Sequence, residues 1–181
     1  MLFAAHGYAA VGLEQVAEAA GVTRGAVYHH FDSKRGLFAA VLAAVHAEAG
    51  ESVAAAADQV WDSDPWEGFE AGCRAFLEFS LSADVRRIML LDGPAIAGWA
   101  AWRDDDAAAS GHHLVEALEE LTQLDLLDAP SIPAAGALLS GAMNEAVLWV
   151  ASHPTHEYRR ALDQAWSTLR ILLSALRATG R

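Results

Sequence analysis

Residues 17–34, AEAAGVTRGAVYHHFDSK, predict two short helices that meet at Gly21. Before this glycine, apolar residues recur every three or four positions and so share one helical face: Leu13, Val16, Ala17 and Ala20. Glycine adopts the left-handed conformation that ends a helix tightly. The stretch therefore predicts a sharp turn between two helices that pack on each other.

The second helix of this pair is predicted to expose a polar face. We expect Thr23 to cap it by accepting a backbone N–H, and Val22 to enter the core. Ala26, Val27 and Phe31 then attach the helix to its neighbours. The outward residues are Thr23, Arg24, Gly25, Tyr28 and His29. A helix-turn-helix presents such a face to the major groove of DNA.

These residues and their neighbours resemble the DNA-binding domain of the tetracycline-repressor (TetR) family over about the first 45 residues. The motifs are Gly7–Ala10, Leu13–Ala17, Gly21–Phe31, Lys34 and Leu37-Phe38. The resemblance implies a homodimer that binds a palindromic double-stranded DNA operator and responds to a small molecule. A weaker likeness to one subgroup of its regulatory domains covers Leu90–Ala95 with Trp99 and Trp102.

The resemblance also places the domains. We expect a helix-turn-helix domain at 1–46 and a helical ligand-binding and dimerisation domain at 47–181. Met1–His6 is similar to the last turns of the family's first helix, whose earlier part is absent. Gly12 stands where the family usually has a hydroxyl residue, so one phosphate contact is expected to be lost.

Composition favours an all-α cytoplasmic protein. The 181 residues include 5 Pro and 1 Cys, which excludes an intramolecular disulfide. We expect no signal peptide and no apolar run near the ~20 residues of a membrane span. The net charge of −12 disfavours nucleic acid as a partner. However, residues 1–50 are near neutral, so the acidic excess belongs to the body.

Periodicity and caps predict the helices of the body. One begins after Ser33 and runs toward Trp61, and another begins at the cap Asp64. A short helix is expected from Asp84 to Gly93-Pro94. The later ranges are 99–124 with an interruption near Ser110-Gly111, 131–152 and 155–178.

The candidate DNA contacts are Thr23, Arg24, Gly25, Tyr28, His29 and Lys34. Arg24 has the chemistry to read guanine or to hold a phosphate. We assign Tyr28, His29 and Lys34 to the DNA backbone. A cation in the first turn of a helix opposes the helix dipole, which favours a phosphate-binding role for Lys34.

Large rings beside glycines and alanines suggest a cavity for an apolar or aromatic ligand, although packing in the core is the simpler reading. The candidate lining residues are Trp66, Phe69, Cys73, Phe76, Met89, Trp99, Trp102, Met143, Asn144 and Trp149. Cys73 is equally well explained as an inert core residue.

The last two helices have more apolar area than one chain is expected to cover, which predicts a four-helix dimer interface. The candidate contacts are Leu139, Met143, Ala146, Val150, Leu162, Trp166, Leu169 and Leu173.

Two other classes of protein are the alternatives to a DNA-binding regulator. An enzyme would need a nucleophile with its base, a metal set or a phosphate loop, and none is recognisable, so we expect no enzymatic activity, metal or cofactor. His112-His113 and His153 with His156 are read as surface or capping histidines. The other alternative is a helical interaction or small-molecule-binding protein with impaired DNA binding.

Overall fold

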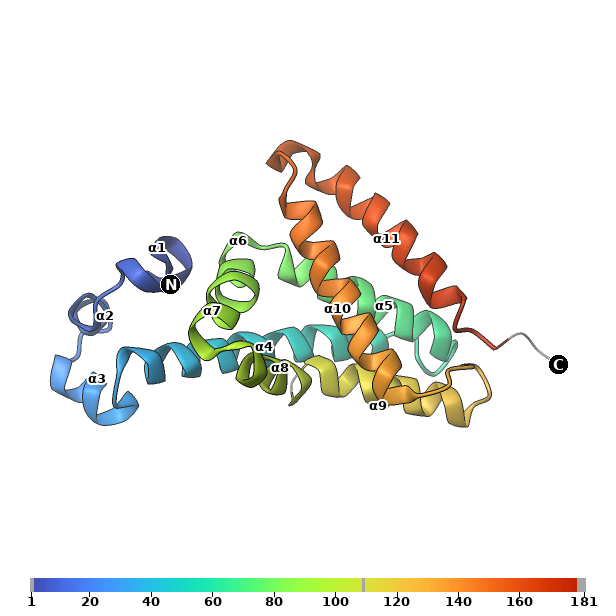
Figure 1. Cartoon of the computed structure of the whole chain (residues 1–181), viewed down its shortest axis with the longest axis horizontal. Coiled ribbons are helices and arrows are strands. Elements are labelled where there is room, and N and C mark those ends of the chain that lie inside the picture. Colours follow the sequence, from blue (N-terminus) through green and yellow to red (C-terminus); the bar gives the residue numbers. More distant parts are fainter. Residues whose placement is uncertain (1, 109, 179–181) are drawn as a thin grey trace.

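The computed structural model describes residues 2–108 and 110–178, which are almost entirely helical (Figure 1). A long central helix, α4, carries a small head at one end and a helical body along the rest (Figure 1). The elements are α1 Leu2–Ala10, α2 Leu13–Ala19, α3 Arg24–Phe31, α4 Lys34–Asp58, α5 Pro65–Ser80, α6 Ala83–Arg86, the π-helix η1 Arg87–Asp92, α7 Gly93–Ala97, α8 Trp99–Ala108, α9 Ser110–Gln123, α10 Ile132–Ala151, the 3₁₀ turn η2 Thr155–Glu157 and α11 Tyr158–Ser174. The expected all-α class is confirmed.

The head is a helix-turn-helix built on the predicted turn. Gly21 has φ +67°, and Thr23 Oγ1 accepts a hydrogen bond from the Ala26 N–H at 3.1 Å. Val27 is the buried anchor of α3, whereas Val22 and Ala26 are exposed. The prediction that Val22 enters the core is therefore wrong, because the tight turn already brings the helices together without it.

Helix α4 crosses the expected domain boundary at 46/47 without a break. Ser33 caps it as predicted, since its Oγ accepts the Gly36 N–H at 3.0 Å. A Cβ at Gly36 would lie 2.1 Å from the carbonyl oxygen of Phe31, so only glycine lets α3 turn so closely into α4. Head and body thus share one rigid helix.

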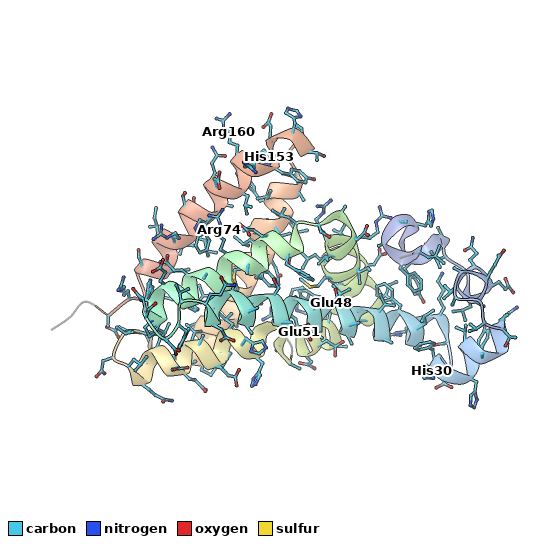
Figure 2. All side chains as sticks on the ribbon, turned by 180° about the vertical axis from the view of Figure 1, so that it is seen from behind. His30, Glu48, Glu51, Arg74, His153 and Arg160 are labelled. Atoms are coloured by element: carbon cyan, nitrogen blue, oxygen red, sulfur yellow. The ribbon has the colours of Figure 1, made fainter. Side chains whose placement is uncertain are left out.

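The body packs α5 and α9 along α4, with α10 crossing them and α11 lying against α10 and α5 (Figure 1). Arg74, labelled on α5 in Figure 2, joins α5 to α11 through Asp163 at 3.6 Å. The predicted cap Asp64 is confirmed as a hydrogen-bond acceptor at the start of α5. Ser131 caps α10 in the same way, near the expected start of that helix. These contacts define the second layer around α4.

Two predicted helix ends are wrong. Gly93-Pro94 does not close the helix from Asp84, because Pro94 occupies the first turn of α7, where no N–H is needed. The chain turns instead at Gly98, with φ +88°. The last helix stops at Ser174 rather than 178, because the Ala178 N–H pairs with the carbonyl oxygen of Leu126 at 2.9 Å.

Two helices, α4 and α10, are long and apolar enough to cross a membrane by length and composition alone. The expectation that no apolar run approaches that length is therefore wrong. Both are packing helices in this fold: α4 contacts α5 and α9, and α10 contacts α5, α9 and α11. Core helices of globular domains share the same composition.

Candidate nucleic-acid interface and internal cavity

The exposed face of α3 is the candidate nucleic-acid interface. Thr23, Arg24, Gly25, Tyr28 and His29 are all exposed, as the sequence analysis expects of groove-facing residues. Val27 alone among the residues of α3 is fully buried. The head lies at the far end of α4 from the C-terminal part of the body, so this face is open to a large partner (Figure 1).

Arg24 is engaged within the head. Its guanidinium forms an ion pair with Glu14 of α2, donates to the Tyr28 hydroxyl at 3.4 Å and lies 5.2 Å from the centre of that ring. The hydrogen bond to Tyr28 and the Glu14 charge raise the pKa of Arg24 above its ordinary value. Arg24 must therefore exchange the Glu14 carboxylate for DNA before it can contact a base or a phosphate.

Lys34 also has a partner inside the chain. Its Nζ donates to the carbonyl oxygen of Ala9 at 3.3 Å and lies 4.4 Å from the centre of the Tyr8 ring. The unfavourable helix dipole therefore does not by itself indicate a phosphate-binding role for Lys34, because α1 already stabilises its charge. Lys34 holds α1 against α4, and a DNA contact would be an additional role.

The head meets the body at the π-helix η1. Asp92 Oδ2 accepts the Tyr8 N–H at 2.9 Å across 84 positions of sequence. That N–H is free to point at Asp92 because Gly7, with φ +78°, interrupts α1. A Cβ at Gly7 would lie 3.0 Å from Nη1 of Arg87. This contact was not predicted from the sequence, although Gly7 in the middle of a helix was a signal for it.

A cavity of about 270 Å³ lies between α4, α5, α9 and α10. Four of the predicted ligand-pocket residues line it: Phe69, Cys73, Phe76 and Met143. Its remaining lining residues are Val53, Ala54, Ala57, Asp58, Trp61, Gly72, Gly111, His113, Leu114, Glu116, Ala117, Glu120 and Ser140. Burial raises the pKa of the Cys73 thiol to about 12, so the thiol is neutral and presents an apolar surface to the cavity.

The other six predicted pocket residues lie outside this cavity. Trp66, Met89, Trp102 and Asn144 are buried in packed core, and the Trp102 indole N–H donates to the carbonyl oxygen of Met89 at 2.7 Å. Trp99 and Trp149 are 68% and 43% exposed. The prediction was wrong for these six, because helical spacing does not show which neighbouring helix covers a ring.

The residues at the mouth of the cavity were not predicted from the sequence. Trp61, in the turn after α4, donates its indole N–H to Oε1 of Glu120 on α9 at 2.9 Å. Asp58 and Glu116 lie beside this pair among the lining residues. Glu116 and Glu120 are one turn apart on α9, a spacing visible in the sequence, but only the packing of α9 on α4 brings them to Trp61.

Most of the predicted dimer contacts are buried inside the chain. Ala146 and Leu162 are half-buried. The buried ones are Leu139, Met143, Val150, Trp166, Leu169 and Leu173. Five of these six were predicted wrongly as side chains of an outer interface, because neighbouring helices of the same chain cover them. Leu169 is buried too, but it lines the groove between α10 and α11.

Helices α10 and α11 expose a different apolar face, with Leu138, Trp149 and Leu172 at 74%, 43% and 53% exposure. A groove of about 1270 Å³ runs between the two helices and is lined by Trp149, Leu172, small residues and both signs of charge. His153 and Arg160 lie near the tip of this helical pair (Figure 2).

The histidine pairs have ordinary partners. His112 and His113 lie 3.0 and 3.4 Å from Glu116, and His153 Nδ1 lies 2.9 Å from the carbonyl oxygen of Trp149. Across residues 2–108 and 110–178, no three His, Cys, Asp or Glu side chains gather as metal ligands. These contacts agree with the interpretation of the histidines as surface and capping residues.

The fold and the exposed face of α3 define a helix-turn-helix protein with an all-helical regulatory body, and comparisons with known proteins place it in a family. The family models "Bacterial regulatory proteins, tetR family" and "Tetracyclin repressor-like, C-terminal domain" match residues 1–41 and 66–176. The chain belongs to the TetR family of transcriptional regulators, which are DNA-binding proteins and not enzymes.

Individual relatives agree with this placement. A TetR-family transcriptional regulator from Pectobacterium atrosepticum has a crystal structure with TM-score 0.79 and 34% identity, over 99% of this chain and 90% of that one. A structure from Shewanella sp. PV-4 shares the fold at 19% identity and TM-score 0.74, over 98% and 93% of the two chains. The HTH-type transcriptional regulator TtgR of Pseudomonas putida is 38% identical over 92 residues, which is 48% of this chain and only 41% of that protein.

Proposed function

We propose that the protein is a cytoplasmic, ligand-responsive transcriptional repressor that binds a palindromic operator as a homodimer and is released by a small apolar or aromatic molecule. The observation that carries the proposal is the pairing of an open recognition face on α3 with a partly open, apolar cavity in the body. One continuous helix, α4, contributes its first turn to the head and its last turns to the cavity wall.

A chain of contacts connects the cavity with the head. Ser140 lines the cavity and donates to Asp106 of α8 at 3.0 Å. Trp102, one turn earlier on α8, donates to Met89 of η1. The end of η1 holds α1 through Asp92. A ligand that displaces α9 or α10 would move α8 and η1, and so would shift the head through α1.

The size of such a movement can be modest. Half-sites one turn apart on DNA are about 34 Å from centre to centre, so two heads must keep a fixed separation. A coupling free energy of ~1–3 kcal/mol between the sites weakens operator binding by about five- to 150-fold. By linkage the operator must weaken ligand binding by the same factor.

The exposed face of α10 and α11 supports the homodimer. The groove carries Glu145 and Asp163 together with Arg159 and Arg160. Because a two-fold axis brings each face against its own copy, a surface with both charges beside apolar residues is self-complementary. We propose that Leu138, Trp149 and Leu172 replace the buried residues as the apolar contacts.

The test is a gel shift with DNA from upstream of the protein's own gene, with a panel of hydrophobic compounds added to the complex. We expect a shifted band that a subset of compounds removes. Tryptophan fluorescence then measures binding of those compounds with and without operator. A chain that shifts no DNA at low salt would instead be a helical interaction protein, the alternative that the intramolecular partners of Arg24 and Lys34 favour.

A further inference from the structure

The walls of the cavity differ sharply between its depth and its mouth. Phe69, Phe76, Leu114 and Met143 provide apolar and aromatic surface from three helices and are all buried. Such a lining accepts a flat or branched apolar group. The Cys73 thiol beside them is neutral and adds no charge. The depth of the cavity therefore selects for shape and apolar surface.

The mouth is acidic. Asp58 ends α4, and Glu116 and Glu120 follow each other on consecutive turns of α9. Among the described residues that line the cavity there is no lysine or arginine. The carbonyl end of the 25-residue helix α4 lies at the same place and adds the negative end of its dipole. Glu51, labelled in Figure 2, continues the stripe of α4 that bears Ala54 and Asp58.

Trp61 gives this mouth a ring that a cation can contact. Its indole N–H is bonded to Glu120 at 2.9 Å, and this bond fixes both the ring and the carboxylate at the cavity wall. A cation near an indole face and a carboxylate is attracted by both. An anion would meet three carboxylates, and the only basic side chain among the described lining residues is His113, which lies 3.4 Å from Glu116. The mouth thus discriminates by charge, independently of the apolar depth.

We propose that the ligand of this cavity is an aromatic or apolar molecule with one positive charge, such as a protonated amine, seated with its apolar part between α5 and α10 and its cation between Trp61, Asp58 and Glu120. This inference rests on the proposed function, because it names the class of molecule that occupies the same cavity.

The test is isothermal titration calorimetry of the full chain with three probes that share a naphthalene ring and have similar size: 2-naphthylmethylamine, 2-naphthylmethanol and 2-naphthoate. At pH 7 these are a cation, a neutral molecule and an anion. We expect the amine to bind most tightly and the carboxylate most weakly. Because exposed charges are screened, raising the salt concentration should reduce the preference for the amine.

Variants locate the charge effect. Asp58→Asn and Glu120→Gln should each weaken amine binding about two- to five-fold, the range for exposed ion pairs, and leave the alcohol unchanged. Glu119→Gln is the matched control, since it removes the same charge from the same helix but does not line the cavity. In Glu120→Gln the new side-chain amide keeps an oxygen that can accept the Trp61 indole N–H, so the wall stays intact.

The outcomes separate the two proposals. Equal or tighter binding of the alcohol or the carboxylate overturns the cationic ligand while leaving the cavity as a ligand site. An amine preference that Glu119→Gln lowers as much as Asp58→Asn also overturns it, because the preference would then come from net charge. Binding of none of the three probes counts against the cavity itself, and hence against the proposed function.

Discussion

Replacing Glu14 by glutamine should strengthen operator binding. In the free protein the Glu14 carboxylate holds the Arg24 guanidinium, and the two side chains are 70% and 56% exposed. An ion pair this exposed is weak and screened by salt, so its loss in the DNA complex lowers affinity by only about two- to five-fold. Glu14→Gln removes that competition and should raise operator affinity by the same factor. The increase in affinity should be larger at low salt.

The assay is fluorescence anisotropy with a labelled operator at several salt concentrations. Removing any acidic residue from the head also reduces its repulsion of DNA, and Glu18→Gln on the same helix measures that general effect. We expect Glu14→Gln to increase operator affinity more than Glu18→Gln does. Arg24→Ala should lower affinity about tenfold or more and relax base preference at one position of each half-site.

The decisive comparison is Glu14→Gln in the Arg24→Ala background. If Glu14 acts by holding Arg24, the excess gain disappears in the double variant. A gain that persists there, or one no greater than that of Glu18→Gln, would show that Glu14 contributes only general repulsion. The ion pair would then be irrelevant to DNA recognition.

Three further predictions concern the body. Leu172→Glu should yield monomers in sedimentation and abolish operator binding, whereas Ile171→Glu, on the adjacent exposed side of α11, should leave the dimer intact; a dimeric Leu172 variant would refute the proposed interface. Asp92→Ala, which removes the acceptor of the Tyr8 N–H, should lower the free energy of unfolding by about 1–2 kcal/mol and weaken ligand–operator coupling; unchanged coupling in the titrations would exclude η1 as the route. Burial lowers the pKa of His46, against the opposing charges of two aspartates. The unfolded chain therefore takes up the proton first, and stability should fall as the pH drops below 6.5; chemical denaturation at pH 7.5 and 5.5 should show a smaller loss in His46→Asn, and equal losses would contradict this.

The local features of the fold could be predicted from sequence. The turn at Gly21 and the caps Thr23, Ser33 and Asp64 occupy the expected places. Each depends on a residue and the three or four positions after it, so the information is contained within one helical turn. The all-helical class followed from composition, which is also independent of the tertiary fold.

Tertiary packing decided which of the predicted site residues are buried and which face solvent. The sequence suggested that Trp99, Trp102 and Trp149 line a cavity, but α8 and α10 leave Trp99 and Trp149 exposed while Trp102 is buried against η1. The same applies to Leu169 and Leu172, of which the first faces the core and the second faces solvent.

Lys34 shows the same division for a charge. Its sequence position put a cation in the first turn of a helix, and only the fold revealed the Ala9 carbonyl and Tyr8 ring that stabilise it. Asp92 and Tyr8, 84 positions apart, could not be paired from either local sequence. Periodicity within a helix fixes which residues share a face, whereas the partner of that face depends on contacts between segments distant in the chain, and these form only when the whole protein folds.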